Sequence, residues 1–273
     1  MIKNKIDFAL IISVKNANPN GDPLNGNRPR TTYDGLGEMS DVCLKRKMRN
    51  TLLRKGETIL VQSDDNRVDD HRSIKDRYDS NAAMGALKKE KDSDKKAQEA
   101  CRQWFDVRAF GQVFAGVDDS NMSIAVRGPV SIQSAFSVEP VTASSIQITK
   151  SVNLKTDAKD PSQKAGDTMG MKHRVDSGIY VSYGSINRQL AEKTGFTDED
   201  AEKIKYALQN LFVDDESSAR PAGSMQVLKV IWWTHKDVVQ SSAKVHQSLI
   251  VKPDGTYELT KLDGVTVEEL EGQ

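Results

Sequence analysis

The sequence has few of the residues from which most reactive centres are built. Only two of its 273 residues are cysteines, Cys43 and Cys101, and they are too few and too scattered for a disulfide framework or a thiolate metal site. The four histidines lie far apart and form no H-x-x-x-H or Cys-His pair, which argues against zinc. We therefore expect no metal, and this cysteine usage favours a reducing, cytoplasmic location.

Other signatures of chemistry and of membranes are also missing. The chain has no G-x-S-x-G, Walker or G-x-G-x-x-G pattern, and the stretch NGDPLNGN lacks the Lys-Ser/Thr pair of a phosphate-binding loop. The apolar run from Phe8 to Val14 is too short to cross a membrane, and no small-residue cleavage site follows it. We expect no cofactor, no catalytic triad and no membrane partner.

The charges cancel in total but are unevenly distributed. Between Arg28 and Lys55 there are eight basic and three acidic residues, whereas the stretch from Asp254 to the C-terminus has six acidic residues and one lysine. Such asymmetry suggests a polyanion site at one end and, at the other, solubility or a surface for a partner. The alternative is that both stretches are ordinary solvated surfaces.

Apolar periodicity and turn signals predict the order of the elements. The loop NPNGDPLNGNRPR (18–30) follows a first strand, and its two Asn-Gly pairs and three prolines largely fix its path. Further strands are expected in 123–141, 145–152, 179–186, 225–235 and 244–253. A helix is expected over 198–212, with the threonine before it as the cap.

The most informative segment is a helix expected over 40–55. Ser40 is its N-cap, and apolar residues at every fourth position form one stripe. Lys45, Arg46 and Arg49 form a basic face beside that stripe, because their spacing of three and four residues places them on neighbouring turns. Such a helix can pack on a sheet and present cations outward, although a merely solvated face is the alternative.

Two polar segments interrupt this order. Residues 62–96 have few large apolar side chains and are expected to form a helical or partly mobile insertion. In the second, 153–178, Met169 and Met171 are the only large apolar side chains between Leu154 and Val175. The whole order is an α+β pattern, and the ferredoxin-like split βαβ unit is the simplest core that fits it.

These features suit contact with a nucleic acid backbone. Lysine and arginine on a helix, serine and backbone N–H groups in a glycine loop, and a polar arm with an apolar pair are parts that hold phosphates and wedge between bases. Phosphate contacts carry no sequence information, so a protein of this kind would hold a strand while its bases stay readable.

Six motifs, in order along nearly the whole chain, carry a resemblance to a known family. They are NPNGDPLNGNRPRTTYDGLGEMSDVCLKRKMRN, DVRAFGQVFAG, VRGPVSIQSAFSVEPV, SIQITKSVN, MGMKHRVDSGIYVSYGSIN and LFVDDESSARPAGSMQVLKVIWW. Together they resemble the backbone subunit of the type I CRISPR interference complex Cascade, in the RAMP superfamily, most closely its type I-C form.

The resemblance implies an α+β fold with an RRM-like (ferredoxin-like) palm, a finger-like insertion and a protruding thumb. The implied segments are the palm in 1–61, 106–151 and 178–273, the last with C-terminal strands, the fingers in 62–105 and the thumb in 152–177.

The resemblance also implies a binding protein rather than an enzyme. Copies stack head to tail along a CRISPR RNA guide, grip its phosphates and present it for pairing with invading DNA. The implied partners are the guide, the target DNA strand, further copies of the chain, other Cascade subunits and a recruited nuclease-helicase that makes the cut.

The resemblance assigns roles to particular residues. The basic helix holds the guide's phosphates, the thumb displaces a base with Met169 or Met171, and the loop after the second palm helix touches the guide. The full set of implied RNA-binding residues is Arg28, Arg30, Lys45, Arg46, Arg49, Lys150, Met169, Met171, Lys172, Arg174, Ser218, Arg220 and Gly223. For Arg28 and Arg30, a place in the subunit interface is the alternative.

A second function stays open beside the first. Backbone subunits of type III complexes, which resemble distant relatives, cleave target RNA with an aspartate in the loop after the first strand, and Asp22 and Asp34 lie in that region. The chain would then be a metal-dependent endoribonuclease. Its motifs fit the non-cleaving type I form better, since the close glycine-rich pattern of the cleaving enzymes is missing.

Overall fold

A central antiparallel sheet organises the chain in this computed structural model, which describes all residues except 117–122, 150–161, 163–168 and 237–238. Its strands are β1 (Ile6–Ala17), β4 (Leu36–Met39), β7 (Val130–Ile132), β8 (Ala135–Pro140), β9 (Ala143–Thr149), β10 (Met169–Ile186), β11 (Met225–His235) and β14 (Val265–Glu271). The order is β14-β11-β1-β10-β8-β4, with β7 and β9 also paired to β10. The expected mixture of helices and strands is confirmed, and the structure shows that the sheet is antiparallel.

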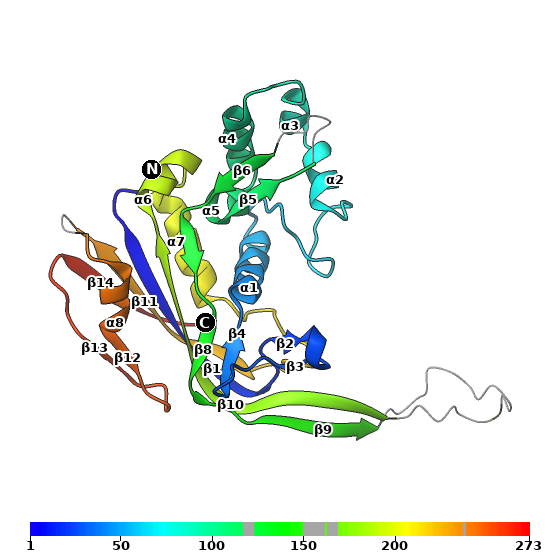
Figure 1. The fold of residues 1–273 in the computed structure, drawn as a ribbon, viewed down its shortest axis with the longest axis vertical. Coiled ribbons are helices and arrows are strands. Elements are labelled where there is room, and N and C mark those ends of the chain that lie inside the picture. The colour runs from blue at the N-terminus through cyan, green and yellow to red at the C-terminus, as the bar shows by residue number, and fades with distance from the viewer. Residues whose placement is uncertain (117–122, 150–161, 163–168, 237–238) are drawn as a thin grey trace.

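The central strand β1 is buried on both faces, which explains why its apolar run shows no alternation. Phe8, Leu10 and Ile12 pack into the main core under the helices, whereas Ala9 belongs to a smaller core on the opposite face. The helices over the main core are α1 (Asp41–Arg54), α6 (Arg188–Thr194) and α7 (Asp198–Gln209) (Figure 1). The smaller core is closed by α8 (Ser242–Gln247), β12 (Leu249–Val251) and β13 (Tyr257–Leu259).

The two long helices of the main core begin where the sequence predicts. The Ser40 hydroxyl caps α1 by accepting a hydrogen bond from the Cys43 N–H at 3.3 Å. Thr197 caps α7 in a capping box with Asp200, in which each side chain accepts from the other residue's backbone N–H. Both predictions are confirmed because a cap depends only on residues within one turn.

A second hydrophobic cluster holds together a group of elements that includes the segment expected to form the fingers, and we call this group the finger-like insertion. The insertion comprises α2 (Ile74–Asp79), α3 (Ala82–Ala86), α4 (Ser93–Gln103), α5 (Phe105–Phe110), β5 (Gly111–Phe114) and β6 (Ile124–Arg127). Tyr78, Trp104 and Phe114 lie at its centre, with ring centroids 5.1–6.5 Å apart. The polar segment 62–96 is therefore folded, and the boundary expected at residue 105 lies inside this cluster, which continues to β6.

A two-stranded ribbon projects from the sheet where the outer part of β10 pairs with β9 alone (Figure 1). Met169 and Met171, on the outer part of β10, are 62% and 56% exposed. The ribbon begins at Ala143 and includes the described end of the segment 152–177 expected to form the thumb. Much of the remaining thumb segment lies outside the described residues.

The segment 244–253 differs from the expected strand. Its first residues belong to α8, and the strand β12 is confined to Leu249–Val251. Ser241 caps α8 by accepting a hydrogen bond from the Lys244 N–H at 3.3 Å, and Val245 on this helix is fully buried in the smaller core. A run this short contains too few apolar residues for its period to separate a helix from a strand.

Candidate nucleic-acid interface

The loop 18–30 is a folded hairpin. It consists of β2 (Gly21–Asp22), a 3₁₀ turn (Pro23–Asn25) and β3 (Arg28–Pro29). Asp22 closes the turn by accepting a hydrogen bond from the Leu24 N–H at 3.2 Å. Gly26 and Asn27 have left-handed backbones with φ of 58° and 60°, a region that glycine and asparagine tolerate best. The path of the loop is therefore held by its own hydrogen bonds and turns.

The hairpin is attached to the first turn of α1. The Asn20 side-chain oxygen accepts hydrogen bonds from both the N–H and the hydroxyl of Ser40, each at 2.9 Å. Arg28 is half-buried on β3, and no carboxylate of the described residues lies within ion-pair distance of it. The Arg30 guanidinium lies 3.7 Å from Asp22, so its charge is partly neutralised. Arg28 is the more available cation.

The three cations expected on α1 point in different directions. Lys45 pairs with Asp41 at 3.0 Å, whereas Arg46 is exposed and has no carboxylate within ion-pair distance in the described part of the chain. Arg49 turns inward, and its Nε donates to the Asp106 carboxylate at 2.9 Å, whose side chain is 1% exposed. The expectation that all three point outward is wrong for Arg49, because a buried carboxylate distant in sequence pairs with it.

The connection between α7 and β11, residues 210–224, lies beside the hairpin. The Asn18 N–H donates to the Ala219 carbonyl at 2.9 Å, and the Lys15 N–H donates to the Ser224 carbonyl at 2.8 Å. The fold thus brings the end of β1, the hairpin, α1 and this connection together. We refer to the hairpin 18–30, α1 and the connection 210–224 as the α1 cluster.

The resemblance places three RNA contacts in the connection 210–224. Ser218 and Gly223 are exposed, as a contact surface requires. Arg220 donates through its Nε to the Asp215 carboxylate at 2.9 Å. The same carboxylate oxygen accepts a hydrogen bond from the Lys47 ammonium, and the Lys47 side chain is 1% exposed.

Lys47 is a further candidate for a role at this interface. Counting the charges along α1 does not distinguish it from the other cations of the helix. Its position does distinguish it, because it lies three residues after Leu44 and four before Thr51, on the stripe of α1 that the core buries. Burial lowers the pKa of the Lys47 ammonium, and the charge of Asp215 raises it in part. A lysine on a buried stripe signals a carboxylate partner elsewhere in the chain.

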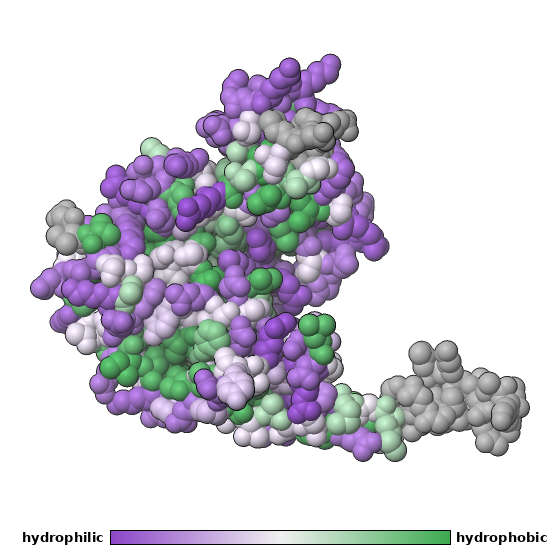
Figure 2. Space-filling view, viewed as in Figure 1, coloured by the Kyte–Doolittle hydropathy of each residue, from purple (hydrophilic) through white to green (hydrophobic). Residues whose placement is uncertain are grey.

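The ribbon carries the other expected contacts on two different faces. Directly opposed residues of paired strands share a face, so Met169 and Met171 lie on the face that includes Gln147. The other face carries Lys172, Arg174, Ile146 and Ile148. Within one copy β10 contacts β3 of the hairpin, and the outer end of the ribbon projects away from α1 (Figures 1 and 2). Lys150 lies outside the described residues.

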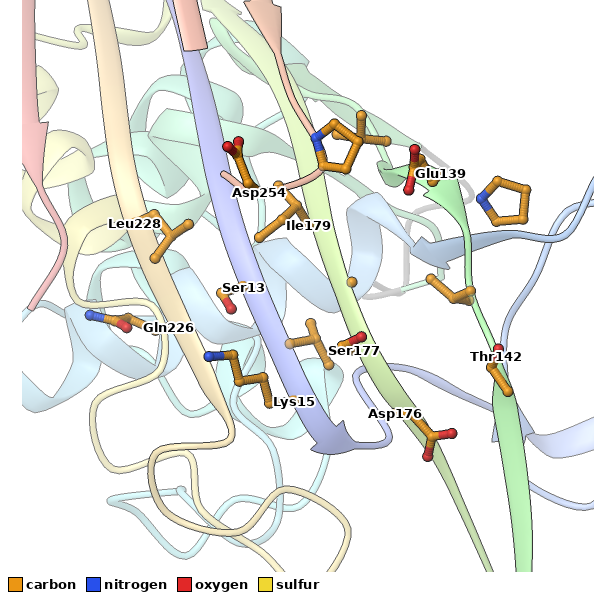
Figure 3. A pocket seen from close by; sticks show the side chains of 16 residues that line it. Ser13, Lys15, Glu139, Thr142, Asp176, Ser177, Ile179, Gln226, Leu228 and Asp254 are labelled. Atoms are coloured by element: carbon orange, nitrogen blue, oxygen red, sulfur yellow. The ribbon is translucent and has the colours of Figure 1, made fainter. Parts of the chain in front are cut away.

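A concave region elsewhere on the surface is chemically unlike the α1 cluster. It is a groove of about 480 Å³ beside the turn between β12 and β13, and Figure 3 shows its side chains. The charged groups lining it are the Lys15 ammonium and the carboxylates of Glu139, Asp176 and Asp254. Three carboxylates against one ammonium repel a polyanion, so this groove does not extend the candidate interface.

Two other kinds of site have no counterpart in the described ranges. No three histidine, cysteine, aspartate or glutamate side chains there gather closely enough to hold a metal ion. Asp22 caps its own turn and faces Arg30, and Asp34 is exposed in a tight turn. None of the described helices is long and apolar enough to span a membrane.

Comparison with known proteins identifies the family to which the sequence is similar. The family described as "CRISPR-associated protein Cas7" matches residues 4–268 of the chain. A curated protein of the same description from Haloferax volcanii is 25% identical over 215 residues, which are 74% of this chain and 62% of that protein. The chain thus spans less than two thirds of the length of this relative.

Two solved structures share the fold. A chain of a "CRISPR RNA-guided surveillance complex, pre-nicking" aligns with a TM-score of 0.51 at 17% identity, over 88% of this chain and 81% of that one. A chain of a "CRISPR RNA-guided surveillance complex" aligns with a TM-score of 0.50 at 18% identity, over 92% and 77%. At these identities the likeness concerns the arrangement of the elements.

Proposed function

The chain belongs to the Cas7 family of CRISPR-associated proteins, and on that premise we propose that it is the repeated backbone subunit of a type I CRISPR interference complex, of the type I-C form. Copies of the chain bind one CRISPR RNA guide along its phosphates in a head-to-tail filament. The guide's bases stay free to pair with invading DNA, so that base pairing supplies the specificity.

The observation that carries this proposal is the α1 cluster. The hairpin and α1 meet the sequence-distant connection 210–224 there, held by their own hydrogen bonds, and they present Arg28, Arg46 and Arg220 beside exposed backbone. Charge-assisted hydrogen bonds from such cations bind phosphate without reading sequence. Because the loops are ordered in advance, little entropy is lost when RNA binds.

The rest of the fold receives the family's roles in the same proposal. The strand order β11-β1-β10-β8, with α1 after β1 and α7 after β10, supports an RRM-like (ferredoxin-like) palm. The finger-like insertion and the ribbon are the fingers and the thumb. Met169 or Met171 of one copy wedges between guide bases held by the next, and Lys172 and Arg174 hold phosphates nearby.

The subunit is non-catalytic in this proposal. Its partners are the guide, the paired target DNA strand, other copies, other subunits of the complex and a recruited nuclease-helicase. The two free cysteines, Cys43 and Cys101, suit a reducing cytoplasm. Asp22 caps its own turn, which supports a structural role for this aspartate. The alternative endoribonuclease would need it as a catalytic residue.

The test is the RNA content of the protein purified after co-expression with a CRISPR array. We compare the wild type with a variant that loses three available cations, Arg28→Ala/Arg46→Ala/Lys172→Ala. The matched control loses three exposed cations outside the α1 cluster and the ribbon, Arg188→Ala/Lys193→Ala/Lys244→Ala. Arg49 stays in place, because its loss would also break a buried ion pair.

We expect guide RNA in oligomers of the wild type and of the control, and its loss from the cation variant. RNA-free wild-type protein would contradict the proposal. Metal-dependent cutting of an RNA paired to the guide, abolished by Asp22→Ala or Asp34→Ala, would contradict the non-catalytic role and favour the endoribonuclease.

A further inference from the structure

One stripe of α1 holds the connection 210–224 in place. The side chains of Lys47, Thr51 and Arg54 are spaced by four and three residues, so they lie one above the other on the helix. The Thr51 hydroxyl donates to the Asn210 carbonyl at 3.2 Å, and Arg54 Nη2 donates to the Val213 carbonyl at 2.6 Å. The third residue of the stripe, Lys47, reaches further along the same connection.

Lys47 and Arg220 converge on one carboxylate. The Lys47 ammonium and Arg220 Nε both donate to the same oxygen of Asp215, and the Lys47 ammonium also lies 5.4 Å from the centre of the Phe212 ring. The Asp215 and Arg220 side chains are 11% and 21% exposed. Two cations and one carboxylate leave one net positive charge, and Arg220 is its most exposed member.

The contact through Nε determines what Arg220 can do. A guanidinium has five N–H donors in a flat fork, and a carboxylate on Nε fixes the plane of that fork. Among the described residues no hydrogen bond engages Arg220 Nη1 or Nη2. Those two nitrogens form the edge that binds a phosphate with two parallel hydrogen bonds.

We propose that Lys47 and Asp215 are positioning residues for RNA binding. Asp215 holds the Arg220 fork in the orientation that receives a phosphate, and Lys47 supplies the counter-charge that lets this carboxylate remain beside a polyanion. The proposal rests on the RNA-binding function above and adds two residues that do not themselves touch RNA.

A substitution of Asp215 provides a test in which two explanations predict opposite changes in RNA affinity. If only net charge mattered, Asp215→Asn would remove a negative charge near the phosphates and tighten RNA binding. If Asp215 positions Arg220, the same change weakens binding, because an amide holds the guanidinium less firmly than a carboxylate does.

The measurement is the dissociation constant of the full-length protein for a labelled single-stranded RNA, by fluorescence anisotropy at one fixed salt concentration. We expect Asp215→Asn to weaken binding by about fivefold to tenfold, the size expected for one ordinary hydrogen bond, because the amide still accepts from Arg220 but without the charge. In an Arg220→Ala background the same change has less than about a twofold effect, because there is no fork left to position. Unchanged or tighter binding by Asp215→Asn, or full additivity with Arg220→Ala, would overturn the proposal.

Asp215→Asn also leaves Lys47 buried without a counter-charge, which can destabilise the fold by itself. The double variant Lys47→Met/Asp215→Asn removes both charges, keeps the net charge and replaces the ammonium with an apolar side chain of similar length. We expect it to weaken RNA binding as Asp215→Asn does while keeping the wild-type melting temperature to within a few degrees. Wild-type affinity in this folded, charge-neutral variant would overturn the proposal.

The outcomes separate this inference from the function on which it rests. If the wild-type protein binds no RNA, the proposed function fails and the positioning role fails with it. If the wild type binds RNA and the Asp215 and Lys47 variants bind it equally well, only the positioning role fails.

Discussion

In the α1 cluster each loop is tied to the helix by side chains, whereas the ribbon leaves the body as two strands whose large apolar side chains are exposed. Lys47 is 1% exposed and Arg49 13%, but Ile148 and Met169 on the ribbon are 45% and 62% exposed. An isolated two-stranded hairpin is only marginally stable in water. The cluster is therefore complete within one copy, while in the proposed function a partner covers the apolar surface of the ribbon. Changes in the first should affect folding, and changes in the second should affect assembly.

The largest effect is expected where the α1 cluster meets the finger-like insertion. The Asp106 carboxylate accepts hydrogen bonds from Arg49 Nε at 2.9 Å and from the N–H groups of Leu60 and Val61 at 2.8 and 3.1 Å. Asp106→Ala leaves a partly buried guanidinium unpaired and two N–H groups without acceptors, which should cost about 3–5 kcal/mol of unfolding free energy. Urea unfolding followed by circular dichroism measures the loss.

The control is Asp41→Ala, which removes another carboxylate paired with a cation of α1. Because that pair with Lys45 is partly solvated, we expect a loss below about 1 kcal/mol, including the interaction of Asp41 with the helix N-terminus. Equal losses from Asp41→Ala and Asp106→Ala would remove the distinction between buried and solvated pairs on this helix.

The next largest effect is expected on the assembly of the oligomer and not on the stability of the fold. Met169→Ser/Met171→Ser changes exposed side chains, so the unfolding free energy should stay within about 0.5 kcal/mol of the wild type. The guide-containing oligomer should nevertheless shrink or dissociate, because the proposed wedge is lost. Light scattering after size-exclusion chromatography measures the mass of the oligomer.

The opposite face of the ribbon provides a matched variant, Ile146→Ser/Ile148→Ser, with two apolar side chains removed from the same strand pair. A smaller oligomer from the isoleucine variant alone would show that this face, and not the methionine face, meets the partner. A loss of stability from either variant would mean that the ribbon packs against its own copy.

The sequence predicts well those structural features that depend on interactions within a few residues. The caps at Ser40 and Thr197 and the course of the loop 18–30 depend on local hydrogen bonds and backbone preferences, and each appears where expected. The same locality explains why the order of the main strands and both long helices could be predicted.

Long-range pairing decides what the sequence could not predict. Arg49 turns inward to pair with Asp106, which is 57 residues away in the sequence. Lys47 is buried beside Asp215, which is 168 residues away. The acidic C-terminal stretch is affected in the same way, since Glu268 pairs with Lys205 at 3.1 Å. Charge counting identifies which residues are ionic, but the tertiary fold selects which charges stay available.

A smaller effect, on the pH dependence of stability, is expected from a titratable residue of α8, outside both regions. The His246 ring donates to the Gly184 carbonyl at 3.2 Å and stacks on Tyr183 at 4.8 Å, and Asp7, Lys5 and His235 are the charged or titratable groups nearby. Burial lowers the pKa of His246. As the pH falls below about 6.5, the unfolded chain takes up a proton before the folded one does, so stability falls.

The check is the unfolding free energy from pH 8 to pH 5. His246→Phe keeps a ring on Tyr183 but cannot titrate, so its stability should fall less steeply below about pH 6.5 than that of the wild type. The same acid slope in both proteins would assign the pH dependence to other groups.

The smallest effect compares two cations on the same exposed part of α1, one paired and one available. Arg46 has no carboxylate within ion-pair distance among the described residues, whereas Lys45 is held by Asp41. Arg46→Ala should lower the slope of log affinity for single-stranded RNA against log salt concentration by about 0.7, the value for one lost phosphate contact. Lys45→Ala should lower the slope by less, because its charge is already shared with Asp41. If the two slopes fell equally, the pair with Asp41 would open when RNA binds, and availability in the free protein would not determine which cations of the α1 cluster hold phosphates.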